Sequence, residues 1–435
     1  MKEGSHFDLG VAIGLLVAMQ IIPQEETSSY LILGELALDG KIIKVKGILP
    51  AAIKASSLDF GLICPKANGG EALWSGNPSI LAADNLMSII QHFRGDSIMM
   101  PPKQELQLDD FKYLDLKDVK GQKAAKRAME IAAAGGHNTI MCGPPGSGKS
   151  MLAKRLPGIL PPLSTSEKLE ISIIASIVGT LGDAIKMQRP FHDPHCSASM
   201  PAMIGGGRNA VPGEVTMTHL GVLFLDELPE FSRSVLESLR QPVESATVTV
   251  SRVNMHVTYP ARFQLIAAMN PCKCGDFGTM MATSCRKAPG CAADYQSRIS
   301  GPLLDRFDLQ IEIPSIHPDK IMMINSKDNE EESADVLKRV AAARKIQEVR
   351  YKDRGIRLNC ELNGEDLSDF AKIDELMRKL LSQAVNRYNL SMMGVNRVLR
   401  VARTIADLQE RDGLVKDDII EALGYRRAMT NVGSY

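Results

Sequence analysis

Short apolar runs separated by amphipathic stretches dominate the middle of the chain. The runs at 139–142, 222–225 and 264–268 are almost entirely apolar. Runs of this length, bounded by polar residues, are typical of buried parallel strands, whereas buried helices need longer runs. Similar runs at 30–33 and 61–64 predict strands near the amino terminus. The pattern therefore predicts an α/β fold with a smaller α+β domain before it.

Helical periodicity replaces the strand pattern in the last third of the chain. Apolar positions there recur at the three- and four-residue spacing of an amphipathic helix. The predicted helices cover 334–352, 374–388, 395–411 and 417–430. We expect a helical domain over 334–435.

Polar and proline-containing stretches mark the domain boundaries. Residues 98–115, which include Met-Met-Pro-Pro-Lys, predict a linker, and the acidic, polar stretch 319–333 predicts a mobile loop. The predicted domains are thus 1–97, an α/β core over 116–318 and the helical domain.

Composition excludes several classes of protein. The 51 basic and 51 acidic residues cancel, so any contact with a polyanion must come from a local patch. Aromatic residues make up 5%, which argues against base stacking as the main binding device. The longest apolar run, 9–22, is shorter than the roughly 20 residues that a membrane-spanning helix needs. We expect a cytoplasmic protein without a membrane partner, whose eight cysteines are reduced thiols or metal ligands.

A phosphate-binding loop follows the first predicted core strand. Residues 143–150 read Gly-Pro-Pro-Gly-Ser-Gly-Lys-Ser, and the residues after them predict a helix. In this strand–loop–helix context, backbone N–H groups and the helix N-terminus bind the phosphates of ATP. Lys149 is expected to reach the β- and γ-phosphates, and the Ser150 hydroxyl to hold Mg²⁺. The predicted nucleotide contacts are Gly143, Pro144, Pro145, Gly146, Ser147, Gly148, Lys149, Ser150 and Met151.

Two carboxylates stand at the end of the second core strand. Asp226 and Glu227 directly follow the run 222–225. Asp226 is expected to complete the Mg²⁺ shell, and Glu227 to polarise the attacking water. A glycine-rich turn beside an unrelated acidic strand end is the alternative, and the spacing disfavours it.

Residues 247–262 alternate apolar and polar positions on both sides of a central turn, which predicts a β-hairpin. This segment holds Arg252, His256 and Arg262 and contains no carboxylate. Contacts to phosphate would give salt-sensitive binding to DNA that does not depend on sequence. A purely structural hairpin is the alternative.

Four of the eight cysteines lie close together in the sequence. Cys272, Cys274, Cys285 and Cys291 fall between residues 272 and 291. Soft thiolates in this number predict a zinc knuckle, although the spacing is not that of a standard zinc finger. Scattered reduced thiols are the alternative.

Taken together, the motifs resemble those of the magnesium-chelatase-like AAA+ ATPases of the ComM/YifB type. The resemblance covers nearly the whole chain and is carried by residues 143–161, 221–232, 267–272 and 298–308. It implies an AAA+ P-loop core with a helical C-terminal lid. Members are implicated in DNA branch migration and in the integration of transforming DNA.

The resemblance also implies roles for single residues. Asn270 resembles the sensor that aligns water against the γ-phosphate, with a capping Asn before Pro271 as the alternative. Arg306 resembles the arginine finger of a neighbouring subunit, and Arg298 is the second candidate. A surface ion pair of Arg306 with Asp305 or Asp308 is the alternative.

A finger that acts on a neighbour implies a homo-oligomeric ring, expected to be a hexamer. In ring helicases of the related clade the hairpin enters the pore, which makes Arg252 and His256 candidate DNA contacts. A second pore loop is expected at 205–209, with Arg208 as its cation.

Two segments depart from the family pattern. The lid segment 390–393 reads Leu-Ser-Met-Met where the family has a sensor arginine, so Arg397 or Arg400 is expected to replace it. Residues 4–65 resemble a Lon-protease-type domain of the ribosomal S5 domain 2-like fold. Ser5 has no evident basic partner, so we expect no peptidase activity. Family members carry further residues before this segment, and we therefore expect a truncated, incompletely packed front domain.

The leading functional prediction is an ATP- and Mg²⁺-dependent ring motor, a helicase or branch-migration enzyme, acting on branched or single-stranded DNA in recombination or transformation. The motor subunit of a magnesium chelatase is the main alternative. A protease-related unfoldase is a weaker one.

Overall fold

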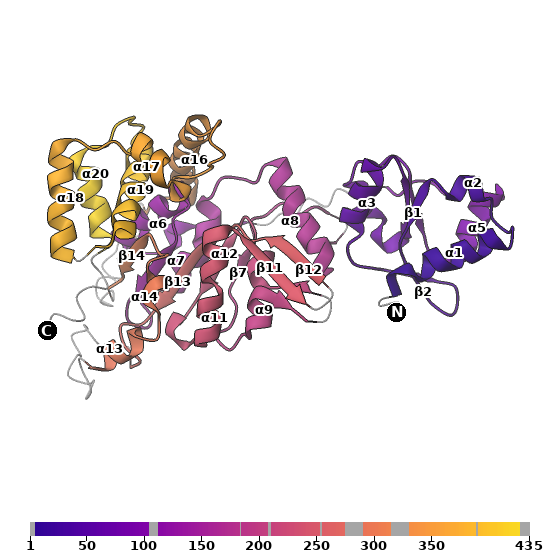
Figure 1. Cartoon of the computed structure of the whole chain (residues 1–435), viewed down its shortest axis with the longest axis horizontal. Helices are drawn as coiled ribbons and strands as arrows, with labels where there is room; N and C mark the ends of the chain where they lie inside the picture. Colours follow the sequence, from indigo (N-terminus) through magenta and orange to yellow (C-terminus); the bar gives the residue numbers. More distant parts are fainter. Residues whose placement is uncertain are drawn as a thin grey trace. The chain divides into compact units, whose positions relative to one another are not determined.

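The structure is a computed structural model of the chain (Figure 1). It describes residues 5–103, 112–182, 184–207, 210–252, 255–274, 290–314, 330–388 and 390–426. These residues form two compact units. The first comprises Met1–Phe111 and Leu163–Gln188, and the second comprises Lys112–Pro162 and Arg189–Tyr435.

The first unit is built around a three-stranded parallel sheet of order β1-β4-β5. The strands β1 (Tyr30–Ile32) and β4 (Gly61–Pro65) confirm the predicted strands, whereas the apolar pattern did not single out β5 (Ile80–Ala83). A short hairpin joins β2 (Glu35–Leu36) to β3 (Ile42–Ile43). The helices are α1 (Asp8–Ala18), α2 (Gln24–Thr27), α3 (Ile48–Ser57), α4 (Gly69–Leu73) and α5 (Leu86–Arg94).

The sheet of the first unit is open, and one side of α1 exposes apolar side chains at four-residue spacing. Val11 and Leu15 are 41% and 61% exposed.

Helix α8 (Thr165–Val178) completes the first unit, although it lies far along the sequence. Ser164 and Glu167 form a capping box at its start, and Gly179 ends it in the left-handed region. The Ser176 hydroxyl donates to the buried carboxylate of Glu71 and accepts from the backbone N–H of Leu49 at 3.3 Å. The sequence pattern, which predicted a front domain from residues 1–97 alone, gave no sign of this contribution.

The second unit contains a five-stranded sheet of order β14-β6-β13-β10-β7, and all its neighbouring strands are parallel. The strands β6 (Thr139–Cys142), β10 (Val222–Leu225) and β13 (Gln264–Met269) confirm the three predicted core strands. The outer strands β7 (Phe191–His192) and β14 (Leu309–Glu312) are short.

Two small hairpins accompany this sheet. They are formed by β8 (Gly205–Gly206) with β9 (Val211–Pro212), and by β11 (Thr247–Arg252) with β12 (Met255–Pro260). The second confirms the predicted hairpin. The helices of this part are α6 (Lys123–Gly135), α7 (Lys149–Arg155), α9 (Met200–Ile204), α10 (Glu214–Met217), α11 (Arg233–Ser238), α12 (Arg240–Ser245), α13 (Gly290–Gln296) and α14 (Gly301–Leu304).

The C-terminal region contains the four predicted helices and one further short helix that the pattern did not predict. They are α16 (Ser333–Arg350), α17 (Gly364–Phe370), α18 (Glu375–Tyr388), α19 (Met392–Leu408) and α20 (Lys416–Gly424), and they gather beside α6 in Figure 1. Their core includes Ile131 of α6 and Leu309 of β14 as well as the apolar side of α19. No helix within the described ranges is long and apolar enough to span a bilayer.

A buried charged cluster connects the sheet to α19. Asp308, immediately before β14, accepts from Arg397 at 2.6 Å and contacts His137 Nδ1 at 3.1 Å. Burial by itself raises the pKa of Asp308, but the His137 hydrogen bond and the Arg397 charge outweigh it, so the pKa lies well below its usual range. This carboxylate therefore stays ionised inside the fold.

Replacing Asp308 by alanine should destabilise the protein by about 3–5 kcal/mol, because Arg397 would remain buried without its partner charge. Urea unfolding followed by far-ultraviolet circular dichroism measures the change. The exposed pair Arg354–Asp366 supplies a control, since Asp366→Ala should cost at most about 1 kcal/mol.

The same carboxylate predicts a pH dependence. Because its folded pKa lies below its unfolded value, its stabilisation is complete above about pH 4 and is lost as the pH falls further. An acid-unfolding midpoint that is unchanged in a folded Asp308→Asn variant would contradict this account.

Candidate functional site

The predicted nucleotide-binding residues lie at one edge of the five-stranded sheet. Strands β6, β10 and β13 run parallel, so their carboxyl ends meet at the same edge. The loop 143–148 leaves β6 there and leads directly into α7. This is the strand–loop–helix context that the motif requires.

Glycine is needed at two positions of this loop. Gly148 has φ +91°, in the left-handed region that residues with a side chain rarely adopt. A Cβ atom on Gly143 would lie 2.2 Å from the carbonyl oxygen of Ile313, so the backbone segments pack too closely for any side chain. The loop can therefore curl tightly in front of α7.

Lys149 lies inside the loop and reaches across to β13. Its ammonium donates to the carbonyl oxygens of Gly143 and Pro144 at 2.7 and 2.8 Å, and to Asn270 Oδ1 at 3.2 Å. Burial lowers the pKa of Lys149, although the neighbouring charge of Asp226 acts in the opposite direction. The structure thus brings the predicted phosphate ligand and the predicted sensor into contact.

Ser150 and Asp226 also meet, from α7 and the end of β10. The Ser150 hydroxyl donates to Asp226 Oδ2 at 2.7 Å, and Asp226 Oδ1 accepts from the backbone N–H of Glu227 at 2.9 Å. A hydroxyl beside a carboxylate offers the hard oxygen ligands that Mg²⁺ prefers. The residues present therefore fit the metal that the sequence predicts.

Glu227 adopts an unusual backbone conformation, with φ +51°. Non-glycine residues in this region carry strain that is often stored at functional sites. Its side chain lines a cavity of about 410 Å³ together with Asn270 and Tyr295. The remaining lining residues are Cys196, Ser197, Glu230 and Lys273. The predicted water-activating group and the predicted sensor thus share one cavity.

Asp193 is a further candidate site residue, which the sequence patterns did not indicate. It follows β7, the neighbour of β10, and lies 3.8 Å from Lys154 Nζ. Burial raises its pKa, Lys154 opposes that rise, and the charge of Asp226 adds to it. A carboxylate at the end of a parallel strand was the available signal, but β7 is only two residues long and was not recognised.

Arg306 lies at the opposite edge of the sheet from the phosphate loop. It precedes β14, and its carbonyl accepts from Asn138, the residue before β6. The four residues of β6 then span roughly 13 Å before the loop begins. Arg306 donates to Glu244 of α12 at 2.6 Å, so its ion pair is not with Asp305 or Asp308.

Arg298, the second finger candidate, behaves differently. It donates to Glu230 at 3.2 Å and lies over the Tyr295 ring at 5.9 Å. Both partners line the cavity beside Glu227. Arg298 is therefore close to Glu227 and Asn270, the predicted catalytic residues of the same chain, whereas Arg306 lies at the opposite edge of the sheet.

Arg397 and Arg400, the two candidates for the missing lid arginine, line a second cavity together with Arg306. This cavity, of about 380 Å³, also includes Arg262 and Asp308. Arg262 lies beyond the end of β12 and contacts Glu361 at 3.6 Å, so it faces this cavity and is not part of the hairpin strands. Cationic side chains from three separated segments thus converge at the amino edge of the sheet.

The hairpin β11–β12 has one buried and one exposed side. Val248 and Val250 are buried against the core, whereas Thr249, Ser251 and His256 are exposed. His256 Nδ1 lies 2.9 Å from the Ser251 hydroxyl. The side chain of Arg252 and the whole of Arg208 lie outside the described residues, so their predicted DNA contacts remain predictions.

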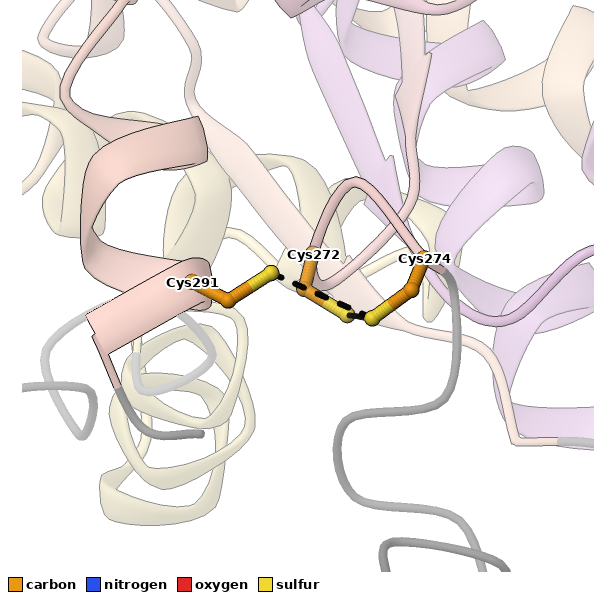
Figure 2. Close-up of side chains that lie close together, drawn as sticks. All are labelled: Cys272, Cys274 and Cys291. Atoms are coloured by element: carbon orange, nitrogen blue, oxygen red, sulfur yellow. Dashed lines mark hydrogen bonds between the residues drawn. The ribbon is translucent and has the colours of Figure 1, made fainter. Parts of the chain in front are cut away.

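Three of the four predicted zinc ligands come together. Figure 2 shows Cys272 and Cys274 in the turn after β13, and Cys291 on α13. The Sγ–Sγ separations are 3.0 Å for Cys272–Cys274 and 3.9 Å for Cys274–Cys291. Cys285 lies outside the described residues.

The strand order and the polar groups at the carboxyl edge define a P-loop ATPase of the AAA+ class. Three family profiles match this chain. They are "Magnesium chelatase, subunit ChlI" at residues 115–321, "Magnesium chelatase, subunit ChlI C-terminal" at 330–426 and "Subunit ChlI of Mg-chelatase" at 1–68. The chain belongs to the magnesium-chelatase-like family of the ComM/YifB type.

Similar proteins match over almost the whole chain. Competence protein ComM of Haemophilus influenzae is 40% identical over 431 residues, which cover 98% of this chain and 83% of the relative. YifB of Escherichia coli is 40% identical over 428 residues, which cover 98% and 82%. Rv2897c of Mycobacterium tuberculosis is 39% identical over 430 residues, which cover 98% and 84%. These matches confirm the predicted family.

Replacing Lys149 by alanine should weaken ATP binding by tenfold or more, on the order of 1.4 kcal/mol, because the loop loses the cation that pairs with the phosphates. Titration with a fluorescent ATP analogue measures this. Lys168→Ala, on α8 of the first unit, is the control and should bind normally. Equal affinity in the Lys149 variant would contradict the assignment.

Replacing Glu227 by glutamine should leave ATP binding intact and lower turnover by about 10²–10⁴-fold, since an amide cannot accept the proton of the attacking water. Phosphate release measures turnover. Glu348→Gln on α16, an exposed position, should retain full activity. A Glu227 variant that hydrolyses ATP normally would show that another group holds the water.

Proposed function

We propose that this AAA+ ATPase is a ring motor that moves DNA, acting as a branch-migration or unwinding enzyme in recombination or natural transformation. The observation that carries the proposal is the placement of Arg306 at the sheet edge opposite the phosphate loop. A finger in that position serves the nucleotide of a neighbouring copy. Hydrolysis then takes place between subunits of a homo-oligomer, for which we propose a hexamer.

The hydrolysis chemistry follows from the residues at the carboxyl edge. The ammonium of Lys149 pairs with the phosphates of ATP. Ser150 and Asp226 together would hold Mg²⁺, and the ion would neutralise phosphate charge when bound. Glu227 accepts a proton from the attacking water, and Asn270 orients that water from the other wall of the same cavity.

The second cavity supports the subunit interface. Arg306 shares it with Arg397 and Arg400, and the Nε atoms of Arg306 and Arg397 make no hydrogen bond within the described residues. Buried cations with spare donors are suited to the γ-phosphate of a neighbour's ATP. We propose that Arg397 or Arg400 replaces the lid arginine that the segment 390–393 lacks.

The hairpin β11–β12 and the competence relative favour DNA as the polymer that is moved. The exposed side of the hairpin offers hydroxyls and His256 and no carboxylate, so phosphate can approach it without repulsion. ComM of Haemophilus influenzae is named a competence protein. A cytoplasmic location fits this role.

A magnesium-chelatase motor subunit is the second candidate, because the two main family profiles bear that name. Such a motor would respond to its chelatase partners and not to DNA. An unfoldase would instead respond to unfolded protein.

A zinc ion at the cysteine cluster is a separate proposal, because neither nucleotide binding nor the ring depends on it.

The DNA assignment predicts that branched or single-stranded DNA raises the ATPase rate several-fold, and that the increase fades as salt screens the phosphate contacts. Steady-state hydrolysis with a four-way junction, with single-stranded DNA and with heparin measures this. Heparin controls for charge alone. No stimulation by either DNA, together with no migration of a labelled junction, would reject the DNA motor.

The trans finger predicts complementation between two inactive variants. Arg306→Ala alone should lower turnover by about 10³-fold or more with ATP binding retained. Mixing it with Glu227→Gln should restore part of the activity, because some interfaces then combine an intact Glu227 with an intact Arg306. Arg378→Ala, exposed on α18, serves as the arginine control. Mixtures that stay inactive although both variants assemble would place the finger elsewhere.

A further inference from the structure

The cysteine cluster has the chemistry of a metal site. The sulfur atoms of Cys272, Cys274 and Cys291 all lie within 4.8 Å of one another. Within the described ranges they are the only group of three or more candidate donors so close together. Thiolates bound tetrahedrally at about 2.3 Å from one zinc ion lie about 3.8 Å apart. The Cys274–Cys291 separation of 3.9 Å matches that value.

The pair Cys272–Cys274 is closer, at 3.0 Å, and would have to open by about 0.8 Å to reach the separation of zinc-bound thiolates. Cys272 is fully buried and Cys274 is exposed, so one ligand is fixed by packing while another gives the ion access from solvent. Three soft thiolates favour zinc over the hard cations Mg²⁺ and Ca²⁺.

We propose that Cys272, Cys274 and Cys291 bind one zinc ion, and that this ion fastens the end of β13 to α13 and thereby holds Asn270 in place for hydrolysis. The proposal of a metal site depends only on the arrangement of the three cysteines. Its effect on hydrolysis rests on the proposed role of Asn270.

The two elements that the ion would join are two walls of the catalytic cavity. On one side, Cys272 is two residues from Asn270, whose Oδ1 accepts from Lys149. On the other side, α13 carries both Cys291 and Tyr295. Asn270 and Tyr295 face the same cavity as Glu227. A zinc ion bonded to Cys272 and Cys274 after β13 and to Cys291 on α13 would therefore set the width of that cavity.

One hydrogen bond already runs along the same connection. Gln296 Nε2 donates to the carbonyl oxygen of Pro271 at 3.0 Å. A single bond of this kind contributes only about 1 kcal/mol. Structural zinc contributes far more and tolerates little movement of its ligands. The ion would thus be the main restraint between the sensor and α13.

The phosphate ligands are held independently of the cluster. Lys149 and Ser150 belong to α7, and Asp226 follows β10. Loss of the ion should therefore impair hydrolysis and spare ATP binding. Loss of hydrolysis with nucleotide binding retained therefore distinguishes loss of the metal from general unfolding, which would abolish both.

The test uses the full chain, with Cys274→Ser and Cys291→Ser as the variants and Cys64→Ala, from the first unit, as the control. Metal content is measured by plasma emission spectroscopy. Cobalt(II) is then added to protein stripped with a strong chelator, and thiolate-to-cobalt absorption is recorded. The expected result is about one zinc per chain in the wild type and the control, with thiolate–cobalt bands, and little zinc in either variant.

The functional arm measures basal ATPase without DNA, together with binding of a fluorescent ATP analogue. Each cysteine variant and the stripped wild type should lose about 10–100-fold in turnover. Each should bind the nucleotide analogue with an affinity within about threefold of the wild type. Added zinc should restore turnover to the stripped wild type but not to the cysteine variants. Nucleotide binding confirms that the variants are folded.

Three results would overturn parts of the proposal. Wild-type protein without zinc and without thiolate–cobalt bands rejects the site. Zinc-free variants with normal turnover reject its coupling to Asn270, and so does loss of nucleotide binding along with hydrolysis. Failure of the DNA motor is distinguishable, because it would appear as absent DNA stimulation with zinc content and basal hydrolysis unaffected.

Discussion

The parallel direction of the strands in the five-stranded sheet is the constraint on which the site depends. Parallel pairing places every carboxyl end at one edge and every amino end at the other. The phosphate loop, Asp226 and Asn270 each follow a strand, so they meet at the carboxyl edge. Arg306 and Asp308 precede β14, so they lie at the amino edge. In the proposed ring, the two halves of a composite active site would lie on opposite edges of each chain, and two copies would be needed to unite them.

The amino edge is stabilised by a different interaction, the buried pairing of Asp308 with Arg397 and His137. It connects β14 to α19, and it keeps one lid arginine beside the cavity that contains Arg306. Removing one partner of a buried ion pair leaves an uncompensated charge inside the fold, which is strongly destabilising. Here the pair fixes the helical region to the sheet at the side from which a neighbouring nucleotide would be reached.

Sequence patterns recovered the central strands, the hairpin and the four long C-terminal helices because these are local signals of period and length. They failed for β5, β7 and β14. Strand β7 is only two residues long, and β14 contains Gln310 and Glu312, so neither forms a continuous apolar run. Asp193 was missed for that reason, since its strand was not recognised. The alternative considered for Arg306 was an ion pair with its sequence neighbours Asp305 or Asp308, but the structure pairs it with Glu244, which lies on a separate helix.

The amino-acid sequence by itself determined the phosphate loop, the two carboxylates after the buried strand and the membership of the family. Each of these depends on residues close together in the chain, whose conformations are set by their immediate neighbours. Only the tertiary structure decided that Arg306 faces away from its own loop, that α8 completes the first unit and that Cys291 reaches the pair Cys272 and Cys274. These features join segments far apart in sequence, and only the packing of the sheet and helices sets the distances between them.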